Sequence, residues 1–357
     1  MKEILREILD AIARGEGAAL VSIVSAKGSL PMSRRSRMLV LAGGAQHGTV
    51  GGGCLEADVH AMGRQAIRSA EASIRRFTLT EAGAGIDGLN CGGTVEMLIE
   101  PLGGSAGPAQ VEIFRQALAA LDERVEVVMA TALAAAPGTA VLGKGLISSS
   151  GMRIGTGALE ASPALRERAV EEALAILGQD RASIVTAPDG ERLFLETVNA
   201  PPSLYLFGGG HVSLAVARVA RAAGFRVVVV DDRPAFANPD RFPEADETLV
   251  LPMEEAFAHL PIDAGSYIVA VTRGHQHDEP VIEQAIRTPA AYIGMMGSKR
   301  KVAIMWERLK ARGATDEALA RVHAPIGLPI GADTPGEIAV SIVAQLVEAR
   351  RLGARQR

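Results

Sequence analysis

Two cysteines stand among glycines in this 357-residue chain, and they are its strongest candidates for chemistry. Cys54 follows three glycines in Gly51-Gly-Gly-Cys54, and Cys91 precedes two glycines in Cys91-Gly-Gly93. Because glycine has no side chain, it leaves a neighbouring sulfur accessible, which suits a thiolate nucleophile or a ligand of a soft metal. We predict Cys54 and Cys91 as the catalytic residues. One alternative is that these cysteines are buried and inert. A second is a Cys–His–Asp hydrolase triad, which no other feature of the sequence indicates.

The segment around Cys54 recurs later in the chain without its thiol. Residues 50–57 align without gaps on residues 154–161 with five of eight positions identical, and Ala158 replaces Cys54. The predicted order of strands, glycine turn and helix is also the same around both segments. These features indicate an internal duplication, with copies at about 1–103 and 104–200. The alternative is that eight residues match by chance.

A basic loop distinguishes the first copy from the second. Residues 28–37 carry three arginines, Arg34 among them, whereas the second copy has only residues 134–138 at this place. The thiol and the guanidinium groups therefore occur together in one copy and are absent together from the other. We predict that the first copy binds the ligand, through three residues of this loop and of the glycine turn: Arg34, Gly52 and Gly53.

A second glycine turn, Gly208-Gly-Gly-His211, lies between an apolar strand ending near Phe207 and a predicted helix at about 212–223. An acidic pair ends the following strand. In dinucleotide-binding domains this layout places a pyrophosphate at the helix N-terminus and a ribose hydroxyl at the acid. Ser213 stands where a third glycine is usual. We predict a phosphate or nucleotide site made of Gly208, Gly209, Gly210, His211, Asp231 and Asp232. The alternative is a Rossmann-like domain that binds nothing.

Two further polar segments follow predicted strands. Residues 272–278 follow the apolar run 267–271, and residues 294–301 follow the run 291–293. Open α/β folds bind their ligands at the carboxyl ends of the strands, so both segments belong to the same edge of the sheet. We predict four more ligand contacts there: Arg273, His275, Gly297 and Ser298. A metal held by the histidines and the aspartate of the first segment is an alternative that we place below substrate binding, so no metal is predicted.

The elements that position these residues form two groups, separated at Asn199-Ala-Pro-Pro202. After this boundary, strands and helices alternate to about residue 345, which predicts a parallel sheet with crossover helices. We therefore expect an α/β protein in which an α+β domain with an internal duplication, residues 1–200, precedes a Rossmann-type domain, residues 201–357.

Composition restricts the class of protein. Apolar residues make up 48% and charged residues 22%, as in soluble globular proteins. A net charge of −4 and an aromatic content of 3% argue against nucleic acid as a partner. Residues 1–17 form an amphipathic pattern rather than a signal peptide, and no stretch of about eighteen apolar residues occurs. We expect a cytoplasmic protein without a membrane partner.

Taken together, the motifs resemble those of the XdhC/CoxI family, accessory factors for xanthine dehydrogenase and related molybdenum hydroxylases. The resemblance thins between about 103 and 200, and Met32 stands where family members often have arginine. The matching blocks occur in the order of the family at residues 28–31, 48–56, 91–93, 99–101, 208–212, 272–278, 292–301 and 323–341.

This resemblance implies a cofactor-binding chaperone more than a catalyst. Members of the family bind molybdenum cofactor, present it for sulfuration by a cysteine desulfurase, and help to insert it into an apo molybdenum hydroxylase. The cofactor is an anionic pterin phosphate that sometimes carries a nucleotide. The resemblance thus implies that Gly208, Gly210 and Asp231 hold the phosphate or nucleotide, and that Cys54 with Arg34 faces the pterin and the metal.

Two other functions fit the same sequence. An NAD(P)-dependent oxidoreductase would use the Gly208 turn and perform hydride chemistry near His275 or His277. An assembly scaffold would leave the Rossmann-type domain empty. A homodimer is expected only because dimers are common among soluble proteins.

Overall fold

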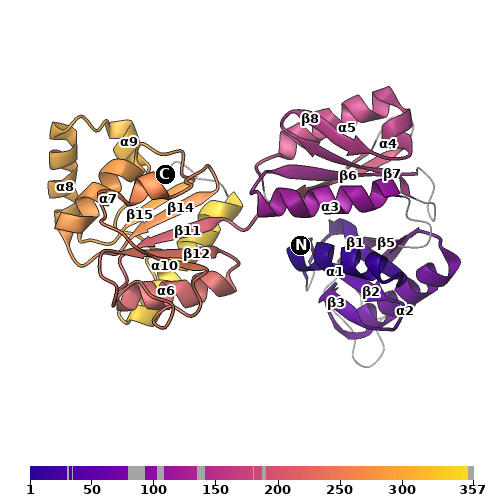
Figure 1. The fold of residues 1–357 in the computed structure, drawn as a ribbon, viewed down its shortest axis with the longest axis horizontal. Helices are drawn as coiled ribbons and strands as arrows, with labels where there is room; N and C mark the ends of the chain where they lie inside the picture. Colours follow the sequence, from indigo (N-terminus) through magenta and orange to yellow (C-terminus); the bar gives the residue numbers. More distant parts are fainter. Residues whose placement is uncertain are drawn as a thin grey trace. The chain divides into compact units, whose positions relative to one another are not determined.

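The computed structural model describes residues 1–29, 32–33, 35–78, 93–102, 108–134, 141–179, 181–186 and 190–352. The chain divides into two compact units, Met1–Ala200 and Pro201–Arg357 (Figure 1). In the described part of the chain, no helix is long and apolar enough to cross a membrane.

The N-terminal unit contains two five-stranded antiparallel sheets with the same strand order. The first sheet has the order β3-β2-β1-β5-β4, and the second has the order β8-β7-β6-β10-β9. This is the arrangement that an internal duplication produces. The strands of the first sheet are β1 (Ala18–Lys27), β2 (Arg37–Leu41), β3 (Gln46–Thr49), β4 (Ser73–Thr78) and β5 (Thr94–Leu102). Those of the second are β6 (Val127–Leu133), β7 (Val141–Ser148), β8 (Gly151–Gly155), β9 (Ala182–Thr186) and β10 (Arg192–Val198).

Helices occupy equivalent places in the two halves. Each half begins with a helix, α1 (Lys2–Ala13) or α3 (Pro108–Asp122), and α1 and α3 contact each other. Their apolar faces share one core with strands of both sheets, so the halves are packed together by buried apolar surface. The helix after the glycine turn is α2 (Gly53–Ser69) in the first half, and α4 (Ala158–Ala161) with α5 (Pro163–Ile176) in the second.

Two buried ion pairs cross between the halves. Arg37 of β2 pairs with Glu196 of β10, and Lys144 of β7 pairs with Glu100 of β5 at 3.0 Å. The side chains of all four are at most 7% exposed. Strand register makes the pairs equivalent, because Arg37 lies opposite Ser22 and Lys144 opposite Thr131 at matching positions of β1 and β6. Each half thus contributes the cation of one pair and the anion of the other.

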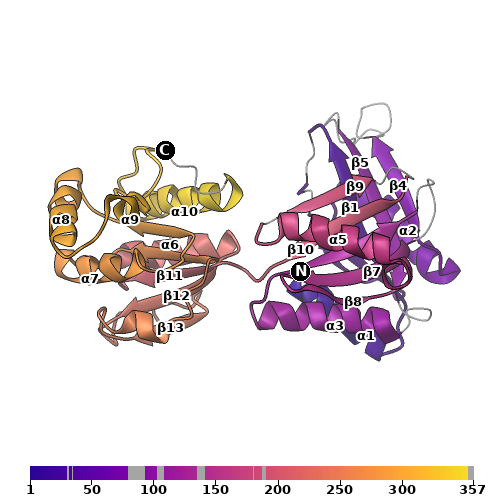
Figure 2. The same cartoon turned by 90° about the horizontal axis from the view of Figure 1, so that it is seen from above.

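The C-terminal unit is a parallel six-stranded sheet with helices on both faces. Its strand order is β13-β12-β11-β14-β15-β16, so the order reverses between β11 and β14. Helices α6 and α10 pack on one face, and α7, α8 and α9 on the other (Figure 2). The strands are β11 (Ser203–Phe207), β12 (Arg226–Asp231), β13 (Glu247–Val250), β14 (Ser266–Ala270), β15 (Tyr292–Met295) and β16 (Val322–His323). The helices are α6 (His211–Ala222), α7 (His275–Ala285), α8 (Lys299–Ala311), α9 (Asp316–Ala320) and α10 (Pro335–Leu352), with a 3₁₀ turn at Ala256–His259.

The predicted fold class is confirmed, but several strands and one helix were not predicted from the sequence. Among them are the four strands at the edges of the two antiparallel sheets, β3, β4, β8 and β9, and none of their residues is fully buried. Edge strands lack the buried alternation on which strand prediction depends, which is why the pattern did not show them. Helix α3 was also not predicted, and α2 begins at Gly53, because the glycine turn itself enters the helix.

Candidate functional site

The Gly208 turn joins β11 to α6 at the point where the strand order reverses. Gly208 has a φ of +104°, and a Cβ there would lie 2.6 Å from the carbonyl oxygen of Val271. A Cβ on Gly209 would collide with the carbonyl oxygen of Phe236. At Gly210, in contrast, no atom of the described residues beyond its chain neighbours lies within 4 Å of the Cβ position. The first two glycines are therefore required by packing, and the third leaves open space at the start of α6.

Ser213 takes the place of the third glycine of the usual motif. It is fully buried, and its hydroxyl donates a hydrogen bond to the carbonyl oxygen of Gly208. A small side chain is thus accommodated between helix and strand, and it stabilises the turn. His211, at the first position of α6, is exposed.

Asp231, at the end of β12, is only 1% exposed and accepts four hydrogen bonds. The donors are Gly209 N at 2.7 Å and Arg233, which donates through its backbone N at 3.1 Å, Nε at 2.8 Å and Nη2 at 3.0 Å. Burial alone would raise the pKa of Asp231, but the hydrogen bonds from Arg233 and Gly209 hold this pKa below its usual value. Asp231 therefore supports the turn, and Asp232, with 29% of its side chain exposed, is the acid that faces solvent.

Arg273 connects the two strand ends that flank β11. Its Nη2 donates to Asp232 Oδ2 at 2.8 Å, and its Nε donates to His277 Nε2 at 2.9 Å. Since Asp232 follows β12 and Arg273 follows β14, this ion pair spans the carboxyl end of β11, beside the glycine turn. The side chain of Arg273 is 43% exposed. His275 begins α7, but its side chain lies outside the described part of the structure.

Asp278 links the starts of α7 and α8. It is 1% exposed, its Oδ1 accepts from the hydroxyl of Thr272 at 2.6 Å, and its Oδ2 accepts from Lys301 Nζ at 2.7 Å. Neither Asp278 nor Lys301 was among the predicted ligand contacts, although both lie in the polar segments that the sequence singled out. The basic run at residues 299–301 was the available signal for Lys301.

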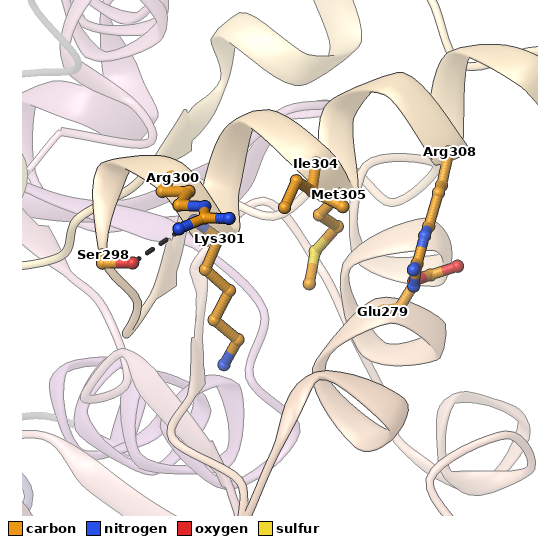
Figure 3. Close-up of a pocket in the computed structure, with 7 residues that line it drawn as sticks. All are labelled: Glu279, Ser298, Arg300, Lys301, Ile304, Met305 and Arg308. Atoms are coloured by element: carbon orange, nitrogen blue, oxygen red, sulfur yellow. Dashed lines mark hydrogen bonds and ion pairs between the residues drawn. The ribbon is translucent and has the colours of Figure 1, made fainter.

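Ser298 caps α8 and borders a cavity of about 470 Å³ between α7 and α8. Its hydroxyl oxygen accepts a hydrogen bond from the backbone N of Lys301 at 3.3 Å. Figure 3 shows side chains of α8 extending toward α7, where Arg308 meets Glu279. The cavity is lined by Glu279, Ser298, Arg300, Lys301, Ile304, Met305 and Arg308. Gly297, the other predicted residue here, precedes this cap and is partly buried.

The first glycine turn of the N-terminal unit presents Cys54 to solvent. Cys54 is exposed and lies in the first turn of α2. Gly52 and Gly53 have φ values of +73° and +65°, and among the described residues no atom beyond their chain neighbours lies within 4 Å of either Cβ position. The second copy of the turn is different, because a Cβ on Gly157 would collide with the carbonyl oxygen of Leu142. The two copies therefore differ in local packing: no described atom lies along the Cβ direction of Gly53, whereas that of Gly157 meets Leu142, although both glycines are exposed.

Glu56 holds the open turn in shape. Its carboxylate accepts hydrogen bonds from the Thr49 hydroxyl, from Gln46 Nε2 at 2.9 Å, and from the backbone N of Val50 and Gly52 at 3.1 and 3.2 Å. The hydrogen bond from Thr49, more than any other contact, lowers the pKa of Glu56. The hydrogen bonds of the turn therefore stabilise Glu56 in its ionised, carboxylate form.

The basic loop lies against this turn. Met32 contacts Gly51, where a Cβ would be crowded by the methionine side chain. Arg35 Nη2 donates to the carbonyl oxygen of Thr197 at 3.3 Å. The pKa of Arg37 is lowered to about 9, because the side chain is buried and because Arg35 is close. Arg34 and Cys91, both predicted as site residues, lie outside the described residues.

These features define a class: a two-unit protein with an exposed thiol on a glycine turn in one unit and a Rossmann domain in the other. Among the described residues, no group of three or more histidine, cysteine, aspartate or glutamate side chains is placed to hold a metal ion.

Comparison with known proteins identifies the family. The model of the XdhC Rossmann domain matches residues 204–346, and that of the XdhC and CoxI family matches residues 11–78. The two matches together span more than half of the sequence. The chain belongs to the XdhC/CoxI family, as its motifs predicted.

Relatives with similar sequences cover part of the chain. The uncharacterized protein YqeB of Escherichia coli (strain K12) is 34% identical over 161 residues, which are 44% of this chain and 29% of YqeB. A protein of Bacillus subtilis (strain 168), named as a probable xanthine dehydrogenase subunit, is 31% identical over 159 residues, 44% of this chain and 46% of that protein. The chain thus matches less than half the length of either relative.

A solved structure shares the fold of the whole chain. It is described as a xanthine dehydrogenase from Bacillus halodurans, and it matches with a TM-score of 0.79 over 100% of this chain and 96% of that one. The two sequences are 23% identical, so the likeness is one of fold.

Proposed function

We propose that this protein is an accessory factor that binds molybdenum cofactor and supports its sulfuration and insertion into a molybdenum hydroxylase such as xanthine dehydrogenase. The observation that carries the proposal is the contrast between the two copies of the glycine turn. Cys54 is exposed beside Gly53, whose Cβ direction meets no described atom, whereas the equivalent Gly157, beside Ala158, packs against Leu142. An accessible thiol beside glycines is a feature of a binding site. Membership of the XdhC/CoxI family points to molybdenum cofactor as the ligand.

The chemistry of molybdenum cofactor fits residues of both units. The dithiolene-bound metal is soft, and a thiolate such as that of Cys54 is a soft ligand or nucleophile. The pterin carries a phosphate, and the open start of α6 at Gly210 presents backbone N–H groups of the kind that bind phosphate. Arg273 adds an exposed guanidinium beside this turn. Each unit, taken by itself, therefore offers a candidate contact for the cofactor.

The proposed partners follow from the same chemistry. A cofactor that is held and then released must be received by an apo molybdenum hydroxylase. If the terminal sulfur is added while the cofactor is bound, a cysteine desulfurase must reach it. An exposed Cys54, rather than a buried one, is what such access requires.

Anaerobic calorimetric titration of the purified chain with molybdenum cofactor, and separately with NAD+ and CMP, tests the proposal. We expect the cofactor to bind with micromolar affinity or tighter, and Cys54→Ala to weaken binding at least tenfold. The matched control is Gln65→Ala, an exposed change on the same helix. Equal binding by wild type and Cys54→Ala, or no binding by either, would contradict the assigned role of the thiol.

An NAD(P)-dependent oxidoreductase is the second candidate, favoured by the glycine turn at the switch point of a Rossmann sheet. Tight binding of NAD+ without binding of molybdenum cofactor would support this alternative.

A further inference from the structure

The acid that a dinucleotide would need at the end of β12 is already occupied. In dinucleotide-binding domains this carboxylate accepts a hydrogen bond from a ribose hydroxyl. A carboxylate offers about four acceptor positions. At Asp231 all of these are used by Gly209 and Arg233, and the residue is 1% exposed. A ribose hydroxyl would have to displace a bidentate guanidinium.

The segment 233–241, which we call the covering segment, closes the same side of the turn. The carbonyl oxygen of Phe236 lies against Gly209, and Arg241 Nε donates to the carbonyl oxygen of Gly209 at 2.9 Å. The guanidinium carbons of Arg233 and Arg241 lie 3.6 and 5.0 Å from the centre of the Phe236 ring. Such cation–π contacts attract the guanidinium groups to the face of the ring. The covering segment is therefore held in place by its own contacts.

The start of α6 is open in the described part of the structure. Apart from its chain neighbours, no described atom lies within 4 Å of the Cβ position of Gly210, and His211 is exposed. Within the described part of the chain, Arg273 is bound there by an exposed ion pair with Asp232 and by a hydrogen bond to His277. Because an exposed ion pair contributes little to stability, a ligand phosphate can replace Asp232 as the partner of Arg273.

We infer that the Gly208 turn selects a terminal phosphate monoester and excludes a dinucleotide, with Arg233, Phe236 and Arg241 as the specificity-determining residues and Arg273 as the cation that contacts the phosphate. This inference rests on the proposed function, because it takes the turn as a ligand site. A phosphate monoester is the chemistry shared by a phosphorylated pterin and by a free nucleoside monophosphate. A dinucleotide, in contrast, presents a pyrophosphate diester and an adenosine, and the covering segment occupies the side where that adenosine would bind.

Calorimetry with the full chain and two probes, CMP and NAD+, tests the inference without any variant. We expect CMP to bind and to compete with inorganic phosphate, and NAD+ to bind at least tenfold more weakly. Binding of NAD+ as tight as that of CMP would overturn the inference, and so would the absence of CMP binding. If molybdenum cofactor still bound in either case, the proposed function would survive, so the two failures are distinguishable.

Variants then test the named residues. Arg273→Gln should weaken CMP binding by roughly tenfold, as the loss of one charged hydrogen-bond donor does. Phe236→Ala combined with Arg241→Ala should raise the affinity for NAD+ while CMP binding is retained. Arg241→Ala alone, which keeps the Phe236 ring, serves if the double variant does not fold. Unchanged NAD+ affinity in a folded variant would contradict the role of the covering segment.

Discussion

The crossed ion pairs of the N-terminal unit allow a quantitative test of how its two halves recognise each other. Lys144 Nζ lies 3.0 Å from Glu100 and donates to the Thr131 hydroxyl at 3.0 Å, and Glu100 also accepts from Gln110 at 3.0 Å. Replacing Glu100 by Gln keeps the shape but leaves the Lys144 charge buried without a counter-charge. Breaking a buried pair in this way costs about 3–5 kcal/mol.

The assay uses the position of the single tryptophan. Trp306 lies in α8 of the C-terminal unit, so its fluorescence follows that unit, whereas far-UV circular dichroism follows both. For a urea dependence of about 3 kcal/mol per M, Glu100→Gln should lower the unfolding midpoint of the N-terminal unit by about 1 M. The fluorescence midpoint should not move.

Matched variants separate charge from shape. Glu196→Gln should produce a loss of similar size, because strand register makes Glu196 the equivalent of Glu100. Removing both charges, by Glu100→Leu with Lys144→Met, should recover most of the loss, since apolar pairs of similar volume replace buried ion pairs well. Glu112→Gln, which removes an exposed partner of Arg115, is the control. If Glu100→Gln behaved like this control, the reasoning would be refuted.

Three further predictions concern the two glycine turns and the helix starts beside them. Gly209→Ala should destabilise the C-terminal unit by about 1–3 kcal/mol, because the added methyl group collides with Phe236, whereas Gly210→Ala should change its stability by no more than about 0.5 kcal/mol. Both changes are measured as shifts of the fluorescence midpoint in urea. Equal losses for the two variants would contradict the described packing. The folded pKa of Glu56 lies below its unfolded value of 4.5, so its stabilisation is complete above that pH and is lost as the pH falls through the folded pKa. The melting temperatures of wild type and Glu56→Gln should therefore converge between about pH 7 and pH 3, and a constant difference would be evidence against the assigned hydrogen bonds. Asp278→Asn should cost about 1.5–3 kcal/mol by removing the charged acceptor of the Lys301 hydrogen bond, measured in the same urea assay, and a change no larger than that of an exposed variant would contradict the described ion pair.

The sequence by itself determined the fold class, the family and the positions of both glycine turns. These follow from patterns between near neighbours: glycines before a helix, an apolar run before a glycine turn, and alternating strands and helices. The strand β11, the Gly208 turn and the helix α6 form within twenty residues, and residues so close along the chain interact in much the same way in any context.

Only the tertiary structure decided what the site residues do. From sequence, Asp231 was the expected ribose acid, yet the Gly209 N–H and the guanidinium of Arg233 occupy it, and Asp232 faces solvent instead. The two copies of the Cys54 turn have similar sequences, but Gly157 packs against Leu142, whereas Gly53 has no described atom at the equivalent position. Such differences depend on which atoms sheet register and loop packing bring together from distant parts of the chain. Arg37 and Glu196 are the clearest case, because nothing near either residue in sequence indicates that they form a pair.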